Sequence, residues 1–174
     1  MKKNITLIGM PGSGKSTHGK FLAKELNFDF IDGDDYIEEK EQMSLQQIID
    51  SKEDQGFLDI EEKRLLEILS GERYVFAPGG SVIYLGKLMD VIKSSSVVVF
   101  LNEPFQVIKK RLTDKKAERI IGLKKKTLEE LYAERNPLYI KYADITIDCL
   151  DKSTDKIVDE IIEKVKNIWI HMFN

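Results

Sequence analysis

The stretch Gly9-Met10-Pro11-Gly12-Ser13-Gly14-Lys15-Ser16 decides the fold, and it follows directly on the apolar run Ile5-Thr6-Leu7-Ile8. The spacing Gly-x4-Gly-Lys-Ser is typical of a phosphate-binding loop, in which consecutive backbone N–H groups surround a phosphate. In such a loop the lysine reaches the outer phosphates, the serine hydroxyl binds Mg²⁺, and the following helix adds the partial positive charge of its N-terminus. A chance turn between a strand and a helix is the alternative interpretation.

The residues after the motif have the pattern of an amphipathic helix. Between Lys15 and Leu26 the side chains of Phe21, Leu22 and Leu26 fall on one helical face. A strand, a glycine-rich turn and a helix in this order favour nucleotide binding over a chance turn. The residues expected to bind ATP are Gly12, Ser13, Gly14, Lys15, Ser16 and Thr17, with Lys15 also catalytic and Ser16 also a ligand of Mg²⁺.

Length and charge indicate one domain with small ligands. The chain has 174 residues and a net charge of −3, and no Pro/Gly/Ser-rich linker divides it, so we expect a single domain over 1–174. This charge provides no overall basic field for nucleic acid or an anionic membrane. The apolar segment near the N-terminus is too short for a signal peptide or a membrane span. We therefore expect a cytoplasmic protein, monomeric by default, whose partner is a small molecule.

Five short runs with strand character alternate with helical patterns along the chain. The runs are 5–8, 28–31, 74–77, 97–101 and 145–149. The helical patterns cover 15–26, 34–52 with a break, 56–69, 84–93, 105–113, 127–143 and 154–170. This alternation predicts a three-layer α/β fold, a five-stranded parallel sheet with helices on both faces. In such folds, ligands bind at the carboxyl ends of the strands.

Two carboxylates follow the second predicted strand, in Asp32-Gly33-Asp34. Because they would project to one side of an extended segment, one could hold Mg²⁺ through water while the other hydrogen-bonds the hydroxyl that attacks the γ-phosphate. A structural alternative is that Asp34 or Asp35 caps the next helix. The position at the ligand edge of the sheet favours the functional interpretation.

Two further segments belong to this edge. Gly79 and Gly80 follow the third predicted strand and offer N–H groups without side-chain obstruction, a tight turn being the alternative. Residues 112–126 carry many cationic side chains, and we expect a mobile lid there that closes over the nucleotide. A solvated charged loop is the alternative for these residues.

Together, the phosphate-binding loop, Asp32-Gly33-Asp34, Gly79-Gly80 and Arg135-Asn136-Pro137-Leu138-Tyr139 resemble in order and spacing the shikimate kinase family. These are small phosphate-loop kinases of the nucleoside monophosphate kinase group, and the resemblance covers nearly the whole chain. It implies that Asp32 lies on the metal side, and that Asp34 lies on the substrate side as the candidate base. It also implies a substrate-binding subregion at 33–62.

The resemblance assigns roles to three arginines as well. It implies that Arg111 packs on the adenine and that Arg119, in the lid, contacts phosphate and substrate as a catalytic residue. It further implies that Arg135 binds the substrate from the closing helix, with Gly79 and Gly80 in the opposite wall. ATP and Mg²⁺ are the cofactors implied.

The chain departs from the family pattern at two positions. Pro78 replaces the first residue of the family's triple glycine, and proline has a fixed φ and no N–H to donate. Leu58 stands where the family carries an arginine for the substrate carboxylate, so Glu61, which would orient that arginine, loses its partner. A charge-assisted hydrogen bond to a carboxylate contributes roughly 1.5–3 kcal/mol, so this loss corresponds to about ten-fold to a hundred-fold in affinity.

These observations predict ATP-dependent phosphorylation of a hydroxyl group on a small metabolite. Shikimate, giving shikimate 3-phosphate in aromatic amino acid biosynthesis, is the first candidate because of the resemblance. A kinase of another small alcohol or sugar acid is the alternative that Leu58 and Pro78 favour. A nucleotide-binding module without catalytic activity is a third possibility. The chain retains Asp34, Arg119 and Arg135, which argues against such a module.

Overall fold

The computed structural model describes residues 2–112 and 119–173. Its centre is a five-stranded sheet in the order β2-β3-β1-β4-β5, and every neighbouring pair is parallel. The strands are β1 (Asn4–Ile8), β2 (Asp29–Asp32), β3 (Tyr74–Ala77), β4 (Ser96–Asn102) and β5 (Ile145–Asp148). The predicted α/β fold with five parallel strands is confirmed, and each strand lies within one or two residues of its predicted bounds.

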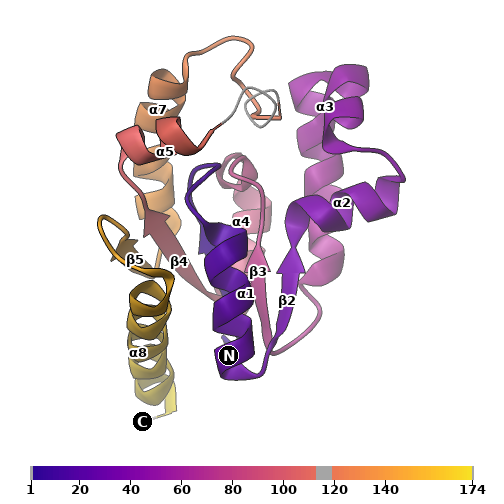
Figure 1. Cartoon of the computed structure of the whole chain (residues 1–174). Helices are drawn as coiled ribbons and strands as arrows, with labels where there is room; N and C mark the ends of the chain where they lie inside the picture. The colour runs from indigo at the N-terminus through magenta and orange to yellow at the C-terminus, as the bar shows by residue number, and fades with distance from the viewer. Residues whose placement is uncertain (1, 113–118, 174) are drawn as a thin grey trace.

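Helices cover both faces of the sheet (Figure 1). One face packs against α1 (Lys15–Leu26) and α8 (Thr154–Phe173), around side chains such as Leu22 and Ile161. The other face packs against α3 (Leu45–Ile68), α4 (Gly86–Ser95), α5 (Phe105–Arg111) and α7 (Leu128–Tyr142). The short helix α2 (Gly33–Glu41) and the 3-10 turn η1 (Val82–Tyr84) pack on this second face as well. The three layers place the carboxyl ends of the strands along one edge.

The break predicted within the helical pattern at 34–52 is confirmed, and the structure locates it. The break falls at Gln42, in the left-handed conformation at φ 52°, and Ser44 then starts α3 through a capping box with Gln47. The gap expected at 53–55 is instead a kink inside α3, where Glu53 has φ 58° and ψ 179°. The capping signal Ser-x-x-Gln was present in the sequence and would have located this start.

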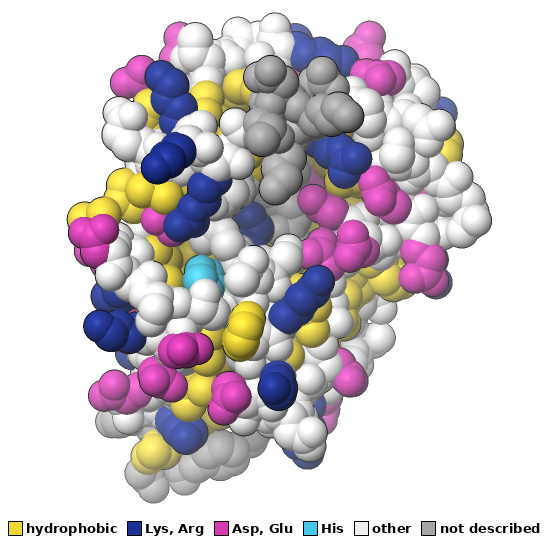
Figure 2. Space-filling model, viewed as in Figure 1, with side chains coloured by type: hydrophobic (Ala, Val, Ile, Leu, Met, Phe, Trp, Pro, Cys, Tyr) yellow, Lys and Arg dark blue, Asp and Glu magenta, His cyan; other side chains and the backbone are white. Residues whose placement is uncertain are grey.

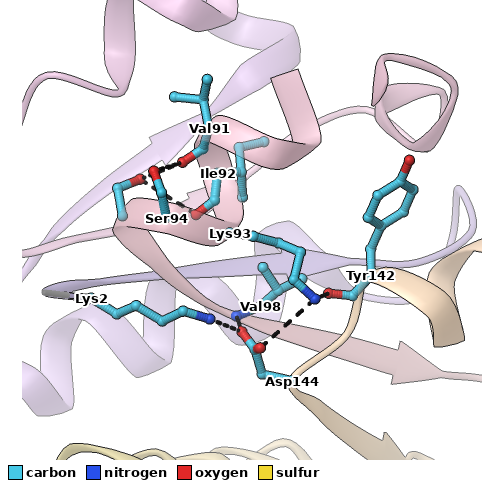
Figure 3. A network of polar contacts seen from close by, with 9 residues as sticks. Lys2, Val91, Ile92, Lys93, Ser94, Val98, Tyr142 and Asp144 are labelled. Carbon is cyan, nitrogen blue, oxygen red and sulfur yellow. Dashed lines mark hydrogen bonds and ion pairs between the residues drawn. The ribbon is translucent and has the colours of Figure 1, made fainter. Parts of the chain in front are cut away.

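A cluster of polar contacts fixes the opposite, amino-terminal edge of the sheet (Figure 3). Asp144, just before β5, accepts a hydrogen bond from the backbone N–H of Val98 at 2.9 Å and from Lys2 Nζ at 2.5 Å. Lys93 Nζ lies 3.9 Å from the same carboxylate and donates to the carbonyl of Tyr142 at 3.1 Å. This carboxylate therefore ties the start of β5 to β4 and α4, far from the ligand edge.

Two smaller predictions, about the packing of Cys149 and of α8, are confirmed. Cys149 is buried, as expected for a small apolar residue, and the apolar stripe of α8 packs on the sheet through Ile157, Val158, Ile161 and Val165. None of the helices over the described ranges is both long and apolar enough for a membrane span.

Candidate active site

A cavity of about 800 Å³ opens at the carboxyl ends of the strands, where the sequence places the ligand edge. In Figure 2 the hollow lies near the middle of the visible face, with basic side chains mainly on one side of it and acidic side chains mainly on the other. The predicted site residues that line this cavity are Gly12, Gly14, Lys15, Ser16, Thr17, Asp32, Asp34, Gly79, Gly80, Arg111, Arg119 and Arg135. Of the predicted set only Ser13 does not line it, because its side chain is buried within the loop.

The loop between β1 and α1 has the backbone geometry of an anion site. Gly12 and Gly14 adopt φ 84° and 89°, which glycine reaches without steric cost, and α1 begins at the next residue. Lys15 Nζ donates to the carbonyls of Gly9 at 2.9 Å and Met10 at 3.2 Å. Burial lowers the pKa of Lys15 to about 8 although Asp34 and Asp32 act in the opposite direction. An incoming phosphate would favour the charged form of this lysine.

Asp32 joins the phosphate-binding loop to α2. Its Oδ2 accepts a hydrogen bond from Ser16 Oγ at 2.5 Å, and its Oδ1 accepts one from the backbone N–H of Asp34 at 3.1 Å. Asp32 is therefore the N-cap of α2, and the alternative that Asp34 or Asp35 caps the helix is wrong. The carboxylate and hydroxyl oxygens gathered here are the ligands that Mg²⁺ prefers.

Asp34 reaches the cavity by a different route from the one expected. The chain turns into α2 at Gly33, so Asp32 and Asp34 do not project from one extended segment, and that assumption was wrong. Both side chains line the cavity because the helix starts at its edge. Burial raises the pKa of Asp34 to about 6, nearby Asp32 adds to this shift, and Lys15 opposes it. A carboxyl group with this pKa is suited to general-base chemistry near neutral pH.

The segment after β3 forms the cavity wall next to the phosphate-binding loop. Pro78, Gly79, Gly80 and Ser81 line the cavity. A Cβ on Gly80 would lie 2.7 Å from Cδ of Pro11, so a side chain there would collide with the phosphate-binding loop. Tyr139 donates from its hydroxyl to the carbonyl of Gly80 at 2.7 Å, which holds this wall against α7.

The three predicted arginines line the cavity with different partners. Arg111 donates to Glu103 at 3.0 Å and to the carbonyl of Gly12 at 3.2 Å. Arg119 Nη1 lies 3.8 Å from a carboxylate oxygen of Glu38 in α2. Of the expected lid at 112–126, the structure describes 112 and 119–126, and 113–118 lie outside the described residues.

Arg135 differs from the other two because it is almost completely buried, with 1 % of its surface exposed. It donates to the carbonyl of Ile121 at 2.6 Å and to the Tyr84 hydroxyl at 3.1 Å, and its guanidinium lies over the Tyr84 ring. In the part of the chain that the structure describes, no carboxylate lies within 4 Å of it. A buried cation without an acidic partner is suited to an anionic ligand.

The α3 side of the cavity is apolar, and the sequence did not identify its residues. Leu45 and Phe57 line the cavity from α3, whereas Leu58 is half-buried and does not line it. Other lining residues outside the predicted set are Pro11, His18, Asp35, Ala77, Leu112, Ile120, Ile121 and Thr154. Their only sequence signal is proximity to a motif, because apolar wall residues have the same pattern as core residues.

The parallel sheet, the phosphate-binding loop and the cavity between them define a phosphate-loop kinase of the nucleoside monophosphate kinase type. Thymidylate kinase from Candida albicans has this fold, with a TM-score of 0.64 at 16% identity over 98% of this chain and 93% of that one. A family model described as shikimate kinase matches residues 11–166. The chain belongs to the shikimate kinase family.

Individual relatives agree with this assignment. A shikimate kinase from Clostridium botulinum is 36% identical, over 98% of this chain and 99% of the relative. Among solved structures, shikimate kinase from Acinetobacter baumannii in complex with shikimate has a TM-score of 0.87 and 28% identity, with 96% of this chain and 94% of that one covered. The family's activity is ATP-dependent phosphoryl transfer to a hydroxyl group.

Proposed function

We propose that this protein transfers the γ-phosphoryl group of ATP to a hydroxyl of shikimate, giving shikimate 3-phosphate and ADP. The observation that supports this most is that one cavity combines the phosphate-binding loop with Asp34 and the buried Arg135. A module that only bound nucleotide would have no need of this second half. The similarity to a shikimate-bound relative over almost the whole chain gives the acceptor.

In the proposed reaction Asp34 accepts the proton of the acceptor hydroxyl as its oxygen attacks the γ-phosphorus. The bond between the γ-phosphorus and the β–γ bridging oxygen breaks, and ADP leaves with that electron pair. Lys15 and the N–H groups of the loop stabilise the negative charge on the phosphoryl oxygens. Ser16 and Asp32 would hold Mg²⁺, which neutralises phosphate charge when it is bound.

The arginines complete this proposal. Arg119 contacts the phosphoryl group once it leaves Glu38, Arg111 packs on the adenine, and Arg135 binds the acceptor carboxylate. The acceptor-binding part of the chain is 33–62, and 112–126 is the lid of the single domain 1–174. We propose in addition that the protein acts as a cytoplasmic monomer in aromatic amino acid biosynthesis.

A coupled assay of ADP release tests the function. We expect turnover that requires both shikimate and Mg²⁺ and is at least ten-fold above the rate with ATP alone. A matched reaction contains shikimate whose carboxylate has been reduced to an alcohol, because Leu58 leaves a kinase of uncharged acceptors as the second candidate. Higher kcat/KM for the reduced compound would favour that candidate, and equal background rates with every acceptor would contradict kinase activity.

A further inference from the structure

Glu61, on α3, is a fully buried carboxyl group with one hydrogen-bond partner. Its side chain has no exposed surface. Oε2 accepts a hydrogen bond from Ser81 Oγ at 2.8 Å, and Oε1 has no partner among the described residues. Burying an ionised carboxylate with so few hydrogen bonds is unfavourable, whereas a protonated acid tolerates it.

Among the described residues, no cation is in contact with this carboxyl group. Across the described ranges, 2–112 and 119–173, no lysine or arginine nitrogen lies within 4 Å of Glu61. One turn earlier on the same helix face, position 58 is leucine, so the place from which a cation would reach Glu61 holds an apolar side chain. The more distant charged groups that face it are Asp34 on α2, Arg135 on α7 and Lys15 on α1.

The carboxyl groups of Glu61 and Asp34 both approach Gly79. Oε1 of Glu61 and Oδ1 of Asp34 lie 2.9 and 3.0 Å from the point where a Cβ on Gly79 would be. Two carboxyl groups so placed do not both ionise readily, because each anion disfavours the other. Burial, with the charge of Asp34 added, raises the pKa of Glu61 to about 8, while Ser81, Arg135 and Lys15 act in the opposite direction. Burial without a counterion and the nearby Asp34 therefore both favour the protonated form of Glu61.

We propose that Glu61 is a positioning residue that works as a neutral carboxylic acid, holding Ser81 and the glycine wall while leaving the charge of Arg135 unneutralised for the acceptor. This inference rests on the proposed function. An ionised Glu61 would attract the Arg135 guanidinium and compete with the carboxylate of the substrate. Compared with the family pattern, the acceptor half has one positive charge fewer at position 58. With Glu61 protonated it also has one negative charge fewer, so its net charge is the same.

The protonation state can be measured without substrate. Protein labelled with ¹³C at the glutamate side-chain carboxyl carbon is titrated by NMR from pH 5 to 9, and the Glu61 signal is the one that is missing in Glu61→Gln. We expect a carboxylic acid signal at pH 7 that titrates near pH 8. A signal that is already that of a carboxylate at pH 6 would overturn the proposal.

Kinetics then test whether neutrality matters for the reaction. Glutamine has the shape of a neutral glutamic acid, so Glu61→Gln should keep kcat and the KM for shikimate within about three-fold of the native values at pH 7, whereas Glu61→Ala should lose at least ten-fold in kcat/KM. The control is Glu163→Gln, the same change at an exposed position of α8. If Glu61→Gln is as impaired as Glu61→Ala, a charged Glu61 is required and the proposal is wrong.

The pH profile separates positioning from a purely structural role. Between pH 7 and 9 the KM for shikimate of the native enzyme, divided by that of Glu61→Gln at the same pH, should rise about five-fold as Glu61 ionises and competes for Arg135. A ratio that stays flat would overturn the inference. The absence of shikimate-dependent turnover in the native enzyme would instead contradict the proposed function, and the NMR titration would still report on Glu61.

Discussion

The nucleotide half and the acceptor half of the cavity are built in different ways. The nucleotide half is centred on one contiguous loop, in which the backbone N–H groups, three positive-φ glycines and one lysine are encoded together. The acceptor half is assembled from side chains of α2, α3 and α7 and the segment after β3. A site made of backbone N–H groups depends on its whole motif, whereas a site made of side chains tolerates the exchange of single residues.

The largest effect is expected from Lys15→Ala, in the nucleotide half. The substitution removes the cation that stabilises the phosphoryl oxygens, so kcat should fall by roughly 10²–10³-fold for every acceptor. Among the described residues Lys15 donates only to the carbonyls of Gly9 and Met10, so the thermal midpoint should hardly change. Steady-state assays are compared with Lys24→Ala, an exposed control on the same helix. An unchanged kcat would contradict the assignment of phosphoryl stabilisation to Lys15 in the nucleotide half.

Asp34→Asn tests the boundary between the halves. Because the amide cannot accept the hydroxyl proton, kcat should fall by about 10²–10⁴-fold. Calorimetry should show Mg·ATP affinity within about three-fold of the native value, because the loop is untouched. An equal loss of nucleotide affinity would instead place Asp34 in the nucleotide half.

Arg135→Lys tests the acceptor half alone. Lysine keeps the charge but not the planar pair of donors, so the KM for shikimate should rise about ten-fold or more while the KM for ATP stays constant. The two constants are measured in the same coupled assay. If both rise together, Arg135 orders the whole cavity rather than the acceptor.

Leu58→Arg sharpens the comparison by restoring the cation that the family pattern has on α3. The new guanidinium should lower the pKa of Glu61 and lower the KM for shikimate, by up to about ten-fold. Leu66→Arg, at an exposed position of the same helix, is the matched control. An unchanged KM together with an ionised Glu61 would show that the acceptor carboxylate lies away from α3.

The smallest effect concerns stability rather than rate. The folded-state pKa of Glu61 is raised above its unfolded value, so its contribution to stability is largest below about pH 4.5 and decreases as pH rises toward 8. Glu61→Gln removes this dependence, and its thermal midpoint should exceed that of the native protein by more at pH 8 than at pH 5. Each kcal/mol corresponds to roughly 2–4 °C for a domain of this size. Parallel melting curves at the two pH values would contradict the raised pKa.

The same contrast explains what the sequence could predict. The loop from Gly9 to Ser16 was readable because all its parts are contiguous, and the alternating pattern gave the sheet and its ligand edge. Asp34 was correctly placed at the ligand edge, but an extended segment was expected where the structure has a helix. Nothing in Asp32-Gly33-Asp34 indicates that this helix starts at Gly33. Leu45 and Phe57 were missed because an apolar wall residue and a core residue present the same periodicity.

The apolar wall on α3 also has a consequence for inhibitor design. A ligand that keeps the carboxylate of shikimate for Arg135 and carries an added short alkyl group directed toward α3 would gain burial against Leu45 and Phe57 in this protein. In family members with arginine at position 58 the same alkyl group would face a guanidinium and remove water from it, which is unfavourable. Selectivity between relatives would then come from one missing positive charge.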